Sequence, residues 1–595
     1  MPGLIEDYAL IGDSHTAALV GRDGSIDWFC TPRFDSGACF AALLGDVDQG
    51  RWLIAPTDGG ASVERRYRDG TLVLETEFRT ATGSVRVVDC MPPRTERPDV
   101  VRIVEGMEGH VDMRMELVVR FDYGSVIPWV ETVGNALRAI GGPDAVTLHT
   151  PVPTRGEGFK TVAAFRIAAG EQVPFVLSWH PSHQGSPRPI DALAAVEHTT
   201  AFWAEWSARC TYDGEWRDAV VRSLVTLKAL TYQPTGGIVA AVTTSLPEYI
   251  GGVRNWDYRY CWLRDATFTL YALMMGGYTE EASAWREWLL RAVAGTPGAI
   301  QTLYGPAGER RIPELELDWL PGYESSRPVR VGNAATKQLQ LDVFGEVMDA
   351  LYQSTRVGLP PLERAWDLQL ALMEFLESNW REPDEGIWEV RGPRRQFVHS
   401  KVMAWVAADR AVRTIDRLHL EGPRDRWRAL RTDIRKEVCD HGYDAERQTF
   451  TQYYGSKELD ASLLQMALVG FLHANDPRVQ GTVDAIVREL SSDGLLLRSN
   501  DGVDGLPPGE GAFLACTFWL ADNYALAGRD VEAREVFERL LLLRNDVGLL
   551  AEEHDPRSHR QLGNFPQALS HIPLVNTALN LSGVRSPARH RREQS

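Results

Sequence analysis

The chain has 595 residues, of which 44% are hydrophobic and 24% are charged, and its formal net charge is −18. This length predicts two or more domains, and the composition is that of an ordinary globular protein. The negative charge argues against nucleic acid as a partner, because phosphate binding requires concentrated Lys and Arg, whereas a small neutral substrate is indifferent to it.

The spacing of the cysteines and the length of the apolar runs indicate in which cellular compartment the protein is expected. The seven Cys are scattered and show no C-x-x-C spacing, which predicts reduced thiols in a cytoplasmic protein rather than a disulfide or zinc framework. The first ten residues contain two acids and no basic-then-apolar pattern, and no apolar run approaches the length of a membrane span. We therefore expect neither a signal peptide nor a transmembrane helix.

The first third of the chain has the pattern of short β-strands separated by turns, which is typical of an antiparallel sandwich. The expected strands are residues 18–20, 26–30, 71–78, 84–89, 100–104, 111–121, 145–148 and 161–167. The polar loop 32–37 either only connects two strands or reaches a neighbouring site, as functional loops do.

From residue 191 the apolar residues recur with the period of a helix. A linker helix is expected at 192–208, followed by helices at 216–233, 261–276, 280–294, 333–355, 361–380, 399–417, 424–439, 459–473, 478–490, 511–527, 530–544 and 566–580. Strand-like patterns interrupt them at 386–390 and 450–454. Six helical hairpins of this kind would close into an (α/α)6 barrel whose loops carry the unusual residues.

The predicted fold is therefore a two-domain, mainly α protein. An N-terminal antiparallel β-sandwich is expected at residues 1–190, a linker helix region at 191–215 and an (α/α)6 barrel at 216–584. The last eleven residues, 585–595, are basic and polar, and they are expected to form a disordered tail.

Residues 255–266, N-W-D-Y-R-Y-C-W-L-R-D-A, combine four aromatics with two Arg and two Asp, just after the loop signal Gly251-Gly252. Such a stretch suits a sugar, because aromatic rings stack on pyranose C–H faces while Arg264 and Asp265 can hold neighbouring hydroxyls by charge-assisted hydrogen bonds. The alternative is a buried Arg–Asp ion pair under aromatic rings, which is a common packing device.

The loop 383–392, P-D-E-G-I-W-E-V-R-G, lies between two predicted helices. Trp388 precedes Glu389, and an apolar wall raises the pKa of a carboxyl group by desolvating it, as a general acid requires. The alternative is that Glu389 only pairs with Arg391 or Arg395.

The segment 549–556, L-L-A-E-E-H-D-P, is followed at 563–568 by G-N-F-P-Q-A. Four ionisable residues in succession form either a solvated surface turn or an active-site cluster. A carboxylate here, across a cavity from Glu389, would be a general base that activates water. Inverting hydrolysis of a glycosidic bond needs such a pair about 6.5–9.5 Å apart.

Other polar loops carry weaker signals. Asp384 and Glu385 are expected in an exposed turn, because Pro383 and Gly386 flank them. Glu510 precedes a predicted helix, where an acid can simply complement the helix dipole. The chain contains no Walker loop, dinucleotide fingerprint, H-E-x-x-H or EF-hand pattern, so no cofactor and no metal is expected.

Together these motifs resemble glycoside hydrolase family 15, the inverting exo-acting α-glucosidases that include glucoamylases, glucodextranases and bacterial trehalases. The start, I-E-D-Y-A-L-I-G-D with D-G-S-I-D-W-F-C-T-P-R-F-D-S, resembles the β-sandwich domain of the trehalase-like branch. The motifs occur in the family's order, and the resemblance covers nearly the whole chain.

The resemblance implies a role for each motif. Glu389 is the general acid, and Glu552 is the general base, with Glu553 as the alternative. Fungal members have Trp-Glu-Glu where this chain has Trp-Glu-Val at 388–390, so the helper carboxylate is absent or supplied from elsewhere, for example by Glu510. The substrate-binding residues are expected to be Tyr258, Trp262, Arg264, Asp265, Trp388, Arg391, Glu510, Glu553 and Asn564.

The expected activity is inverting, exo-acting hydrolysis of an α-glucoside. Trehalose is the first candidate substrate, with isomaltose, maltose or short α-glucans second, and a disaccharide phosphorylase is a remote alternative. The expected partner is therefore a small neutral di- or oligosaccharide. The resemblance leaves open whether the protein is a homo-oligomer and whether phosphate or a divalent ion assists.

Overall fold

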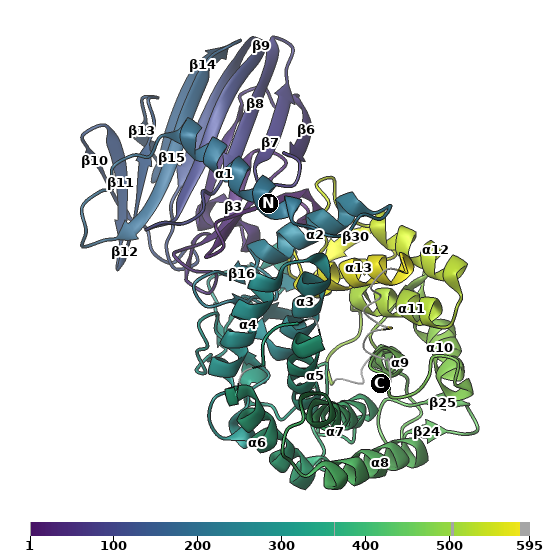
Figure 1. Ribbon diagram of the computed structural model, residues 1–595. Coiled ribbons are helices and arrows are strands. Elements are labelled where there is room, and N and C mark those ends of the chain that lie inside the picture. Colours follow the sequence, from purple (N-terminus) through teal and green to yellow (C-terminus); the bar gives the residue numbers. More distant parts are fainter. Residues whose placement is uncertain (1, 357, 362, 501–504, 584–588, 590–595) are drawn as a thin grey trace.

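The computed structural model describes residues 2–356, 358–361, 363–500, 505–583 and 589, with a large sheet in its first part and mainly helices, with short strands between them, in the rest (Figure 1). The predicted tail at 585–595 lies outside the described residues except for residue 589. Among the described residues, no helix has the length and apolar character of a membrane span. All seven cysteines are described, and each is a free thiol.

The first part of the chain forms an antiparallel sheet, as the sequence predicts. The long strand β9 (Asp99–Val118) joins the two halves of this sheet. Its first half pairs with β8 (Gly83–Cys90) and β15 (Gln172–Pro181), and its second half pairs with β5 (Arg51–Pro56) and β14 (Lys160–Ala168). The other strands of this sheet are β1 (Tyr8–Gly12), β2 (Ala17–Gly21), β3 (Ser25–Cys30), β4 (Ala38–Phe40), β6 (Ser62–Tyr67), β7 (Leu74–Arg79), β10 (Trp129–Val133), β11 (Ala136–Gly141), β12 (Asp144–His149) and β13 (Arg155–Glu157).

The sequence predicts two strands where the structure has β9 alone. Gly106 and Gly109 lie between the two predicted strands and suggest a turn, but the strand continues through them. A Cβ at Gly106 would lie 2.0 Å from the carbonyl oxygen of Ala168. This glycine therefore permits the close approach of a neighbouring chain segment within the sheet.

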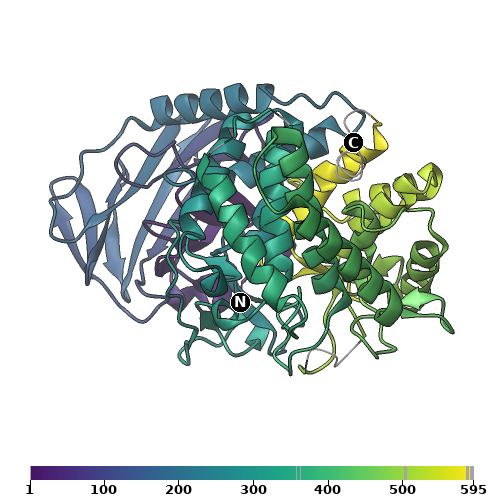
Figure 2. The ribbon, with the colours of Figure 1, turned by 60° about the horizontal axis from the view of Figure 1, so that its bottom comes forward.

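The helix α1 (Ala192–Ala208) coincides with the predicted linker helix and lies against β9 and β15, as Figure 2 shows. The structure then contains α2 (Arg217–Ala229), α3 (Leu263–Gly276), α4 (Thr279–Ala292), α5 (Asp342–Arg356), α6 (Glu363–Asn379), α7 (Val398–Leu418), α8 (Arg424–His441), α9 (Gln465–Leu468), α10 (Pro477–Leu490), α11 (Leu514–Leu526), α12 (Asp530–Leu541) and α13 (Ala568–Leu581).

Alternate helices form a closed ring. Each of α3, α5, α7, α9, α11 and α13 contacts the next in this order, and α13 contacts α3. The helices between them pack outside: α4 against α3, α8 against α7, and α12 against α11. The loops that precede the inner helices are therefore gathered at one end of the ring.

Two predicted helices differ most from the structure, because a 3₁₀ turn and irregular chain replace part of one and most of the other. The helix expected at 333–355 begins only at Asp342, after a 3₁₀ turn, Ala334–Lys337. The helix expected at 459–473 is a 3₁₀ turn, Ala461–Leu464, followed by the four residues of α9. Gly470, with φ of 83°, stands just beyond it in a left-handed conformation that ends a helix.

The β part is fixed to the loops at this end of the ring by buried polar contacts. The indole Nε1 of Trp28 donates to the carbonyl of Val242 at 2.8 Å. The Arg259 guanidinium donates to the carbonyl of Ser36 at 2.9 Å. The polar loop 32–37 thus packs against the segment that carries the aromatic motif.

Candidate active site

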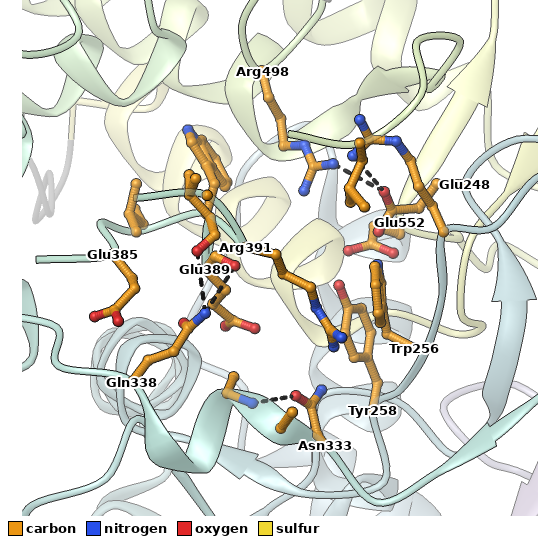
Figure 3. A pocket seen from close by; sticks show the side chains of 18 of the residues that line it. Glu248, Trp256, Tyr258, Asn333, Gln338, Glu385, Glu389, Arg391, Arg498 and Glu552 are labelled. Atoms are coloured by element: carbon orange, nitrogen blue, oxygen red, sulfur yellow. Dashed lines mark hydrogen bonds and ion pairs between the residues drawn. The ribbon is translucent and has the colours of Figure 1, made fainter. Parts of the chain in front are cut away.

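A cavity of about 300 Å³ lies at the N-terminal ends of the inner helices (Figure 3). Its walls come from the loops before α3, α5, α7, α11 and α13, which are far apart in sequence. Of the residues predicted from sequence, it is lined by Tyr258, Arg264, Trp388, Glu389, Arg391 and Glu552. The volume lies at the lower end of the range for small-molecule sites.

The aromatic motif at 255–266 contains a buried Arg–Asp ion pair and also contributes residues to the cavity. Asp257 and Arg259 form a buried ion pair at 2.6 Å, and Asp257 also accepts a hydrogen bond from the backbone N–H of Gly332. This pair packs the core beneath the site. Tyr258 and Arg264 face the cavity instead. The side chain of Asp265 lies outside the described part of the structure.

Glu389 is held at the cavity wall by its neighbours. The indole N–H of Trp262 donates to its Oε1 at 2.5 Å, and the amide of Gln338 donates to its backbone carbonyl at 3.0 Å. Arg264 donates to the carbonyl of Ile387 in the same loop at 2.8 Å. Glu389 adopts a φ of 59°, an uncommon conformation for a non-glycine residue that these contacts maintain.

The aromatic contact to Glu389 comes from Trp262, where the sequence suggested Trp388. The Trp388 indole donates to Asp460 Oδ1 at 2.9 Å, and its ring packs against Phe513 and Trp519. The Glu389 loop is therefore fixed to α11 through Trp388.

Arg391 pairs with Glu314 at 2.7 Å, and its guanidinium lies 4.2 Å from the ring centroid of Trp256. The predicted alternative was that Glu389 pairs with Arg391 or Arg395; Arg391 pairs with Glu314 instead, and the Arg395 guanidinium lies over the ring of Tyr453. Both Arg391 and Trp256 line the cavity, where the guanidinium can donate to hydroxyl groups and the ring can pack on a sugar face.

Glu552 and Glu553 are neighbours whose side chains lie in different surroundings. Glu552 lines the cavity, and its Oε2 accepts no hydrogen bond from the described residues. Glu553 begins β29 (Glu553–Asp555) and accepts a hydrogen bond from the backbone N–H of Gly511 at 2.8 Å. Because successive side chains of an extended segment point in opposite directions, only one of the two faces the cavity.

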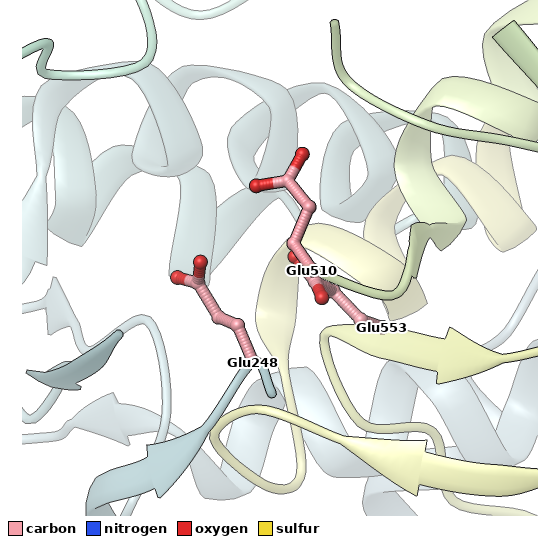
Figure 4. Close-up of side chains that lie close together, drawn as sticks. All are labelled: Glu248, Glu510 and Glu553. Carbon is pink, nitrogen blue, oxygen red and sulfur yellow. The ribbon is translucent and has the colours of Figure 1, made fainter. Parts of the chain in front are cut away.

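The carboxyl groups of Glu248, Glu510 and Glu553 converge (Figure 4), and Glu248 also lines the cavity with Glu552. Burial, followed by the carboxylate of Glu248, raises the pKa of Glu552 well above its usual range, and Arg498 opposes this rise. Burial, Glu248 and Glu510 raise the pKa of Glu553 in the same way. A negative charge in this group is therefore costly.

The side chain of Arg498 compensates part of this charge. It donates to Glu248 Oε2 at 2.9 Å and also binds Glu510. One oxygen of each of Glu248, Glu510 and Glu553 lies within 4.8 Å of the others, a spacing that could hold a cation. The Arg498 guanidinium supplies positive charge to two of them, and Arg254 lies 3.4 Å from Glu510, so arginine side chains already occupy this carboxylate cluster.

Two predicted site residues lie behind the cavity wall. Glu510 lies beside Glu553 and Arg498 and is not among the residues that line the cavity with Glu389. Asn564 is buried, accepts from Thr243 at 2.8 Å and donates to the carbonyl of Trp256 at 2.9 Å. Its amide supports the aromatic wall from behind.

The expectation that Asp384 lies in an exposed turn is wrong. Its side chain is fully buried and accepts a hydrogen bond from the backbone N–H of Leu341 at 3.0 Å. Glu385 likewise accepts from the N–H of Leu339 at 2.8 Å. These two acids join the Glu389 loop to the segment before α5.

The predicted site residues leave out eight polar or aromatic residues that line the cavity: Glu248, Arg254, Trp256, Asn333, Gln338, Glu385, Arg498 and Phe513. Glu248 and Arg498 lie in segments without a recognisable signature. Trp256 is one of the four aromatic residues of the stretch 255–266, so its aromatic character was a signal for a role in the site.

Two carboxyl groups, Glu389 and Glu552, thus line one small cavity with aromatic rings and guanidinium groups between them (Figure 3). This is the arrangement of a glycoside hydrolase, which needs one carboxyl group to protonate the leaving oxygen and another on the opposite side of the sugar.

Comparisons with known proteins agree with this class. Residues 214–579 match the family model of glycosyl hydrolases family 15, and residues 2–180 match that of the trehalase-like N-terminal domain. The chain is 38% identical to a trehalase of Mycobacterium tuberculosis over 97% of this chain and 89% of that protein. It is 35% identical to a trehalase of Thermoplasma volcanium over 97% and 93%.

A bacterial glucoamylase complexed with acarbose has a similar fold, with a TM-score of 0.76, 13% identity and coverage of 98% of this chain and 95% of that chain. The protein belongs to glycosyl hydrolases family 15.

Proposed function

We propose that this protein is a trehalase, which hydrolyses trehalose with one water to two glucose molecules. The observation that carries the proposal is the small cavity in which Glu389 and Glu552 face one sugar-sized space. The full-length similarity to trehalases, including the N-terminal part, supports trehalose as the substrate.

The proposed acid is Glu389. Its proton passes to the glycosidic oxygen as the C–O bond breaks, and the hydrogen bond from Trp262 to its Oε1 holds the carboxyl group in place. The other contacts of the 385–391 loop hold the carboxyl group in the orientation that this transfer requires.

The proposed base is Glu552. Glu552 lines the cavity opposite the Glu389 loop, so its carboxylate can accept the proton of a water that attacks the anomeric carbon. Arg264 and Asp265 would hold the terminal glucose, with Tyr258 and Trp262 around it. Because water attacks from the side opposite the leaving group, one of the two glucose molecules is released as the β-anomer.

The proposed architecture follows from the ring of inner helices. We assign it as an (α/α)6 barrel at 216–584, preceded by a linker helix region at 191–215 and a β-sandwich at 1–190 whose two halves share β9. The closed contacts of α3, α5, α7, α9, α11 and α13 support this assignment.

Proton NMR tests the proposal directly. Purified protein is mixed in turn with trehalose, isomaltose and maltose in phosphate-free buffer, and the anomeric signals are followed in the first minutes. We expect fresh β-glucose from trehalose and little from the other two. Faster release from isomaltose or maltose would assign the enzyme to the glucoamylase type, and release of glucose 1-phosphate after phosphate is added would contradict hydrolysis.

The pH dependence of activity should reflect the crowding around Glu552. The base must be ionised, and burial and Glu248 raise its pKa, so kcat/KM on trehalose should fall on the acid side at a pH above the usual range for Glu. Glu248→Gln removes one cause of the rise and should move this acidic limb to lower pH. Glu280→Gln, an exposed acid elsewhere, should leave the limb unchanged. A limb that stays in place in Glu248→Gln would contradict the assigned coupling.

A further inference from the structure

Exposed apolar side chains gather at one end of the β part. Trp129 is 83% exposed and Phe159 is 81% exposed, and both line a groove of about 650 Å³ together with Ile127 and Val130. Monomeric proteins rarely expose a contiguous apolar patch of this kind, and such patches mark interaction sites.

Two strand edges border the same groove. Within the described residues, β10 pairs only with β11, and β13 pairs only with β14. Every residue of β10 and of β13 is exposed. Figure 1 places both strands at the end of the sheet that points away from the helices. An open edge with unpaired backbone groups is a template for a further strand.

We infer that two copies of this chain associate through this edge, with β10 paired antiparallel to β10 of the second copy. A pairing centred on Glu131 places Trp129 opposite Val133 of the second copy, and Val130 opposite Thr132. Aromatic residues opposite β-branched residues and pairs of β-branched residues are favourable across strands. The strand W-V-E-T-V is therefore complementary to itself, as a two-fold interface requires.

The charges of the groove favour a second copy. The chain carries a net charge of −18, so the repulsion between two copies is smallest where the surfaces that meet are locally neutral. The groove is neutral, because its ionisable residues are Glu131, Arg155, Glu157 and Lys160. The two Glu131 side chains meet at the centre of the pairing, and Arg138 donates to Glu131 at 2.8 Å in each copy, which offsets their repulsion.

The first test is the mass of the full chain in solution, measured by light scattering after size exclusion at micromolar concentration. We expect twice the mass of one chain for the natural protein. The double variant Trp129→Ser/Phe159→Ser should have the mass of one chain and keep its turnover per chain. Leu542→Ser, which removes another side chain that is 83% exposed, should stay dimeric. A monomeric natural protein, or a double variant that remains dimeric, would overturn the inference.

The second test addresses the strand pairing itself. Residues directly opposite in an antiparallel pair have Cβ atoms about 4.5–5.5 Å apart, close to disulfide distance. Glu131→Cys should therefore form a covalent dimer under mild oxidation, and Leu542→Cys should not. A dimer that Glu131→Cys fails to cross-link contradicts the register. A monomer whose groove instead binds an α-glucan or another protein also contradicts a second copy as the occupant.

Discussion

Glu552→Gln should lower kcat on trehalose by about 10²–10⁴-fold, which is the contribution of a general base. Glutamine has nearly the same shape as glutamate but cannot accept a proton from water. The fold should stay intact, because the substitution removes a charge whose pKa is raised by burial and by Glu248. We expect the thermal unfolding midpoint near neutral pH to be unchanged or higher than in the natural protein.

Glu553→Gln is the matched control, since it changes the neighbouring buried acid in the same way. Glu553 accepts a hydrogen bond from Gly511 and does not line the cavity, and a glutamine oxygen can accept the same bond. Its loss of turnover should be much smaller. The opposite ranking of the two variants would make Glu553 the base.

A further experiment separates loss of the base from general damage to the site. Azide needs no deprotonation to attack the anomeric carbon, so it bypasses the base. Glu552→Ala, which also creates space, should regain turnover with azide and yield β-glucosyl azide. The same addition should not rescue a variant whose defect is misfolding or lost substrate binding.

The positions of most helices follow from the sequence because their apolar period is a local property. The helix α1 coincides with the prediction at both ends, and α8 and α10 each begin within a residue of the predicted start. Each of these helices buries one face, which is the condition under which periodicity is informative.

The segment before α5 shows where local pattern fails. Residues 338–341 were predicted to be helical, but their backbone N–H groups at Leu339 and Leu341 donate to Glu385 and Asp384. The backbone of this segment is therefore used to hold the Glu389 loop. No local pattern predicts these two hydrogen bonds, because the donor and acceptor of each are more than forty residues apart in sequence and meet only in the folded protein.

The cluster of charged residues near Glu552 could not have been predicted either, because its members come from segments that are far apart in sequence. Glu248 precedes α3, whereas Arg498 and Glu510 precede α11, and the two segments have no common signature. The motif order pointed to Glu389 and Glu552, but the environment that sets the pKa of Glu552 is a product of tertiary structure alone. The sequence therefore suggested the reacting groups, whereas the surroundings that shift the pKa of Glu552 are visible only in the folded structure.

Glu389→Gln should also lower kcat on trehalose by about 10²–10⁴-fold, but the loss should depend on the leaving group. The leaving glucose of trehalose must be protonated as the glycosidic bond breaks, and the amide of Gln cannot supply that proton. Fluoride leaves without protonation, so α-glucosyl fluoride should be hydrolysed by Glu389→Gln at nearly the natural rate. Glu552→Gln should lose activity on both substrates, because each still needs an activated water.

The comparison of the two substrates is what identifies the acid. A Glu389→Gln variant that loses both activities equally would show that Glu389 positions the loop rather than donates a proton, since the Trp262 contact to its Oε1 would then be its main role. Glu382→Gln, an exposed acid shortly before the same loop, is the control and should match the natural protein on both substrates. If instead Glu389→Gln keeps its turnover on trehalose, the proton must come from another group, and Glu385 is the remaining carboxyl group of that loop at the cavity wall.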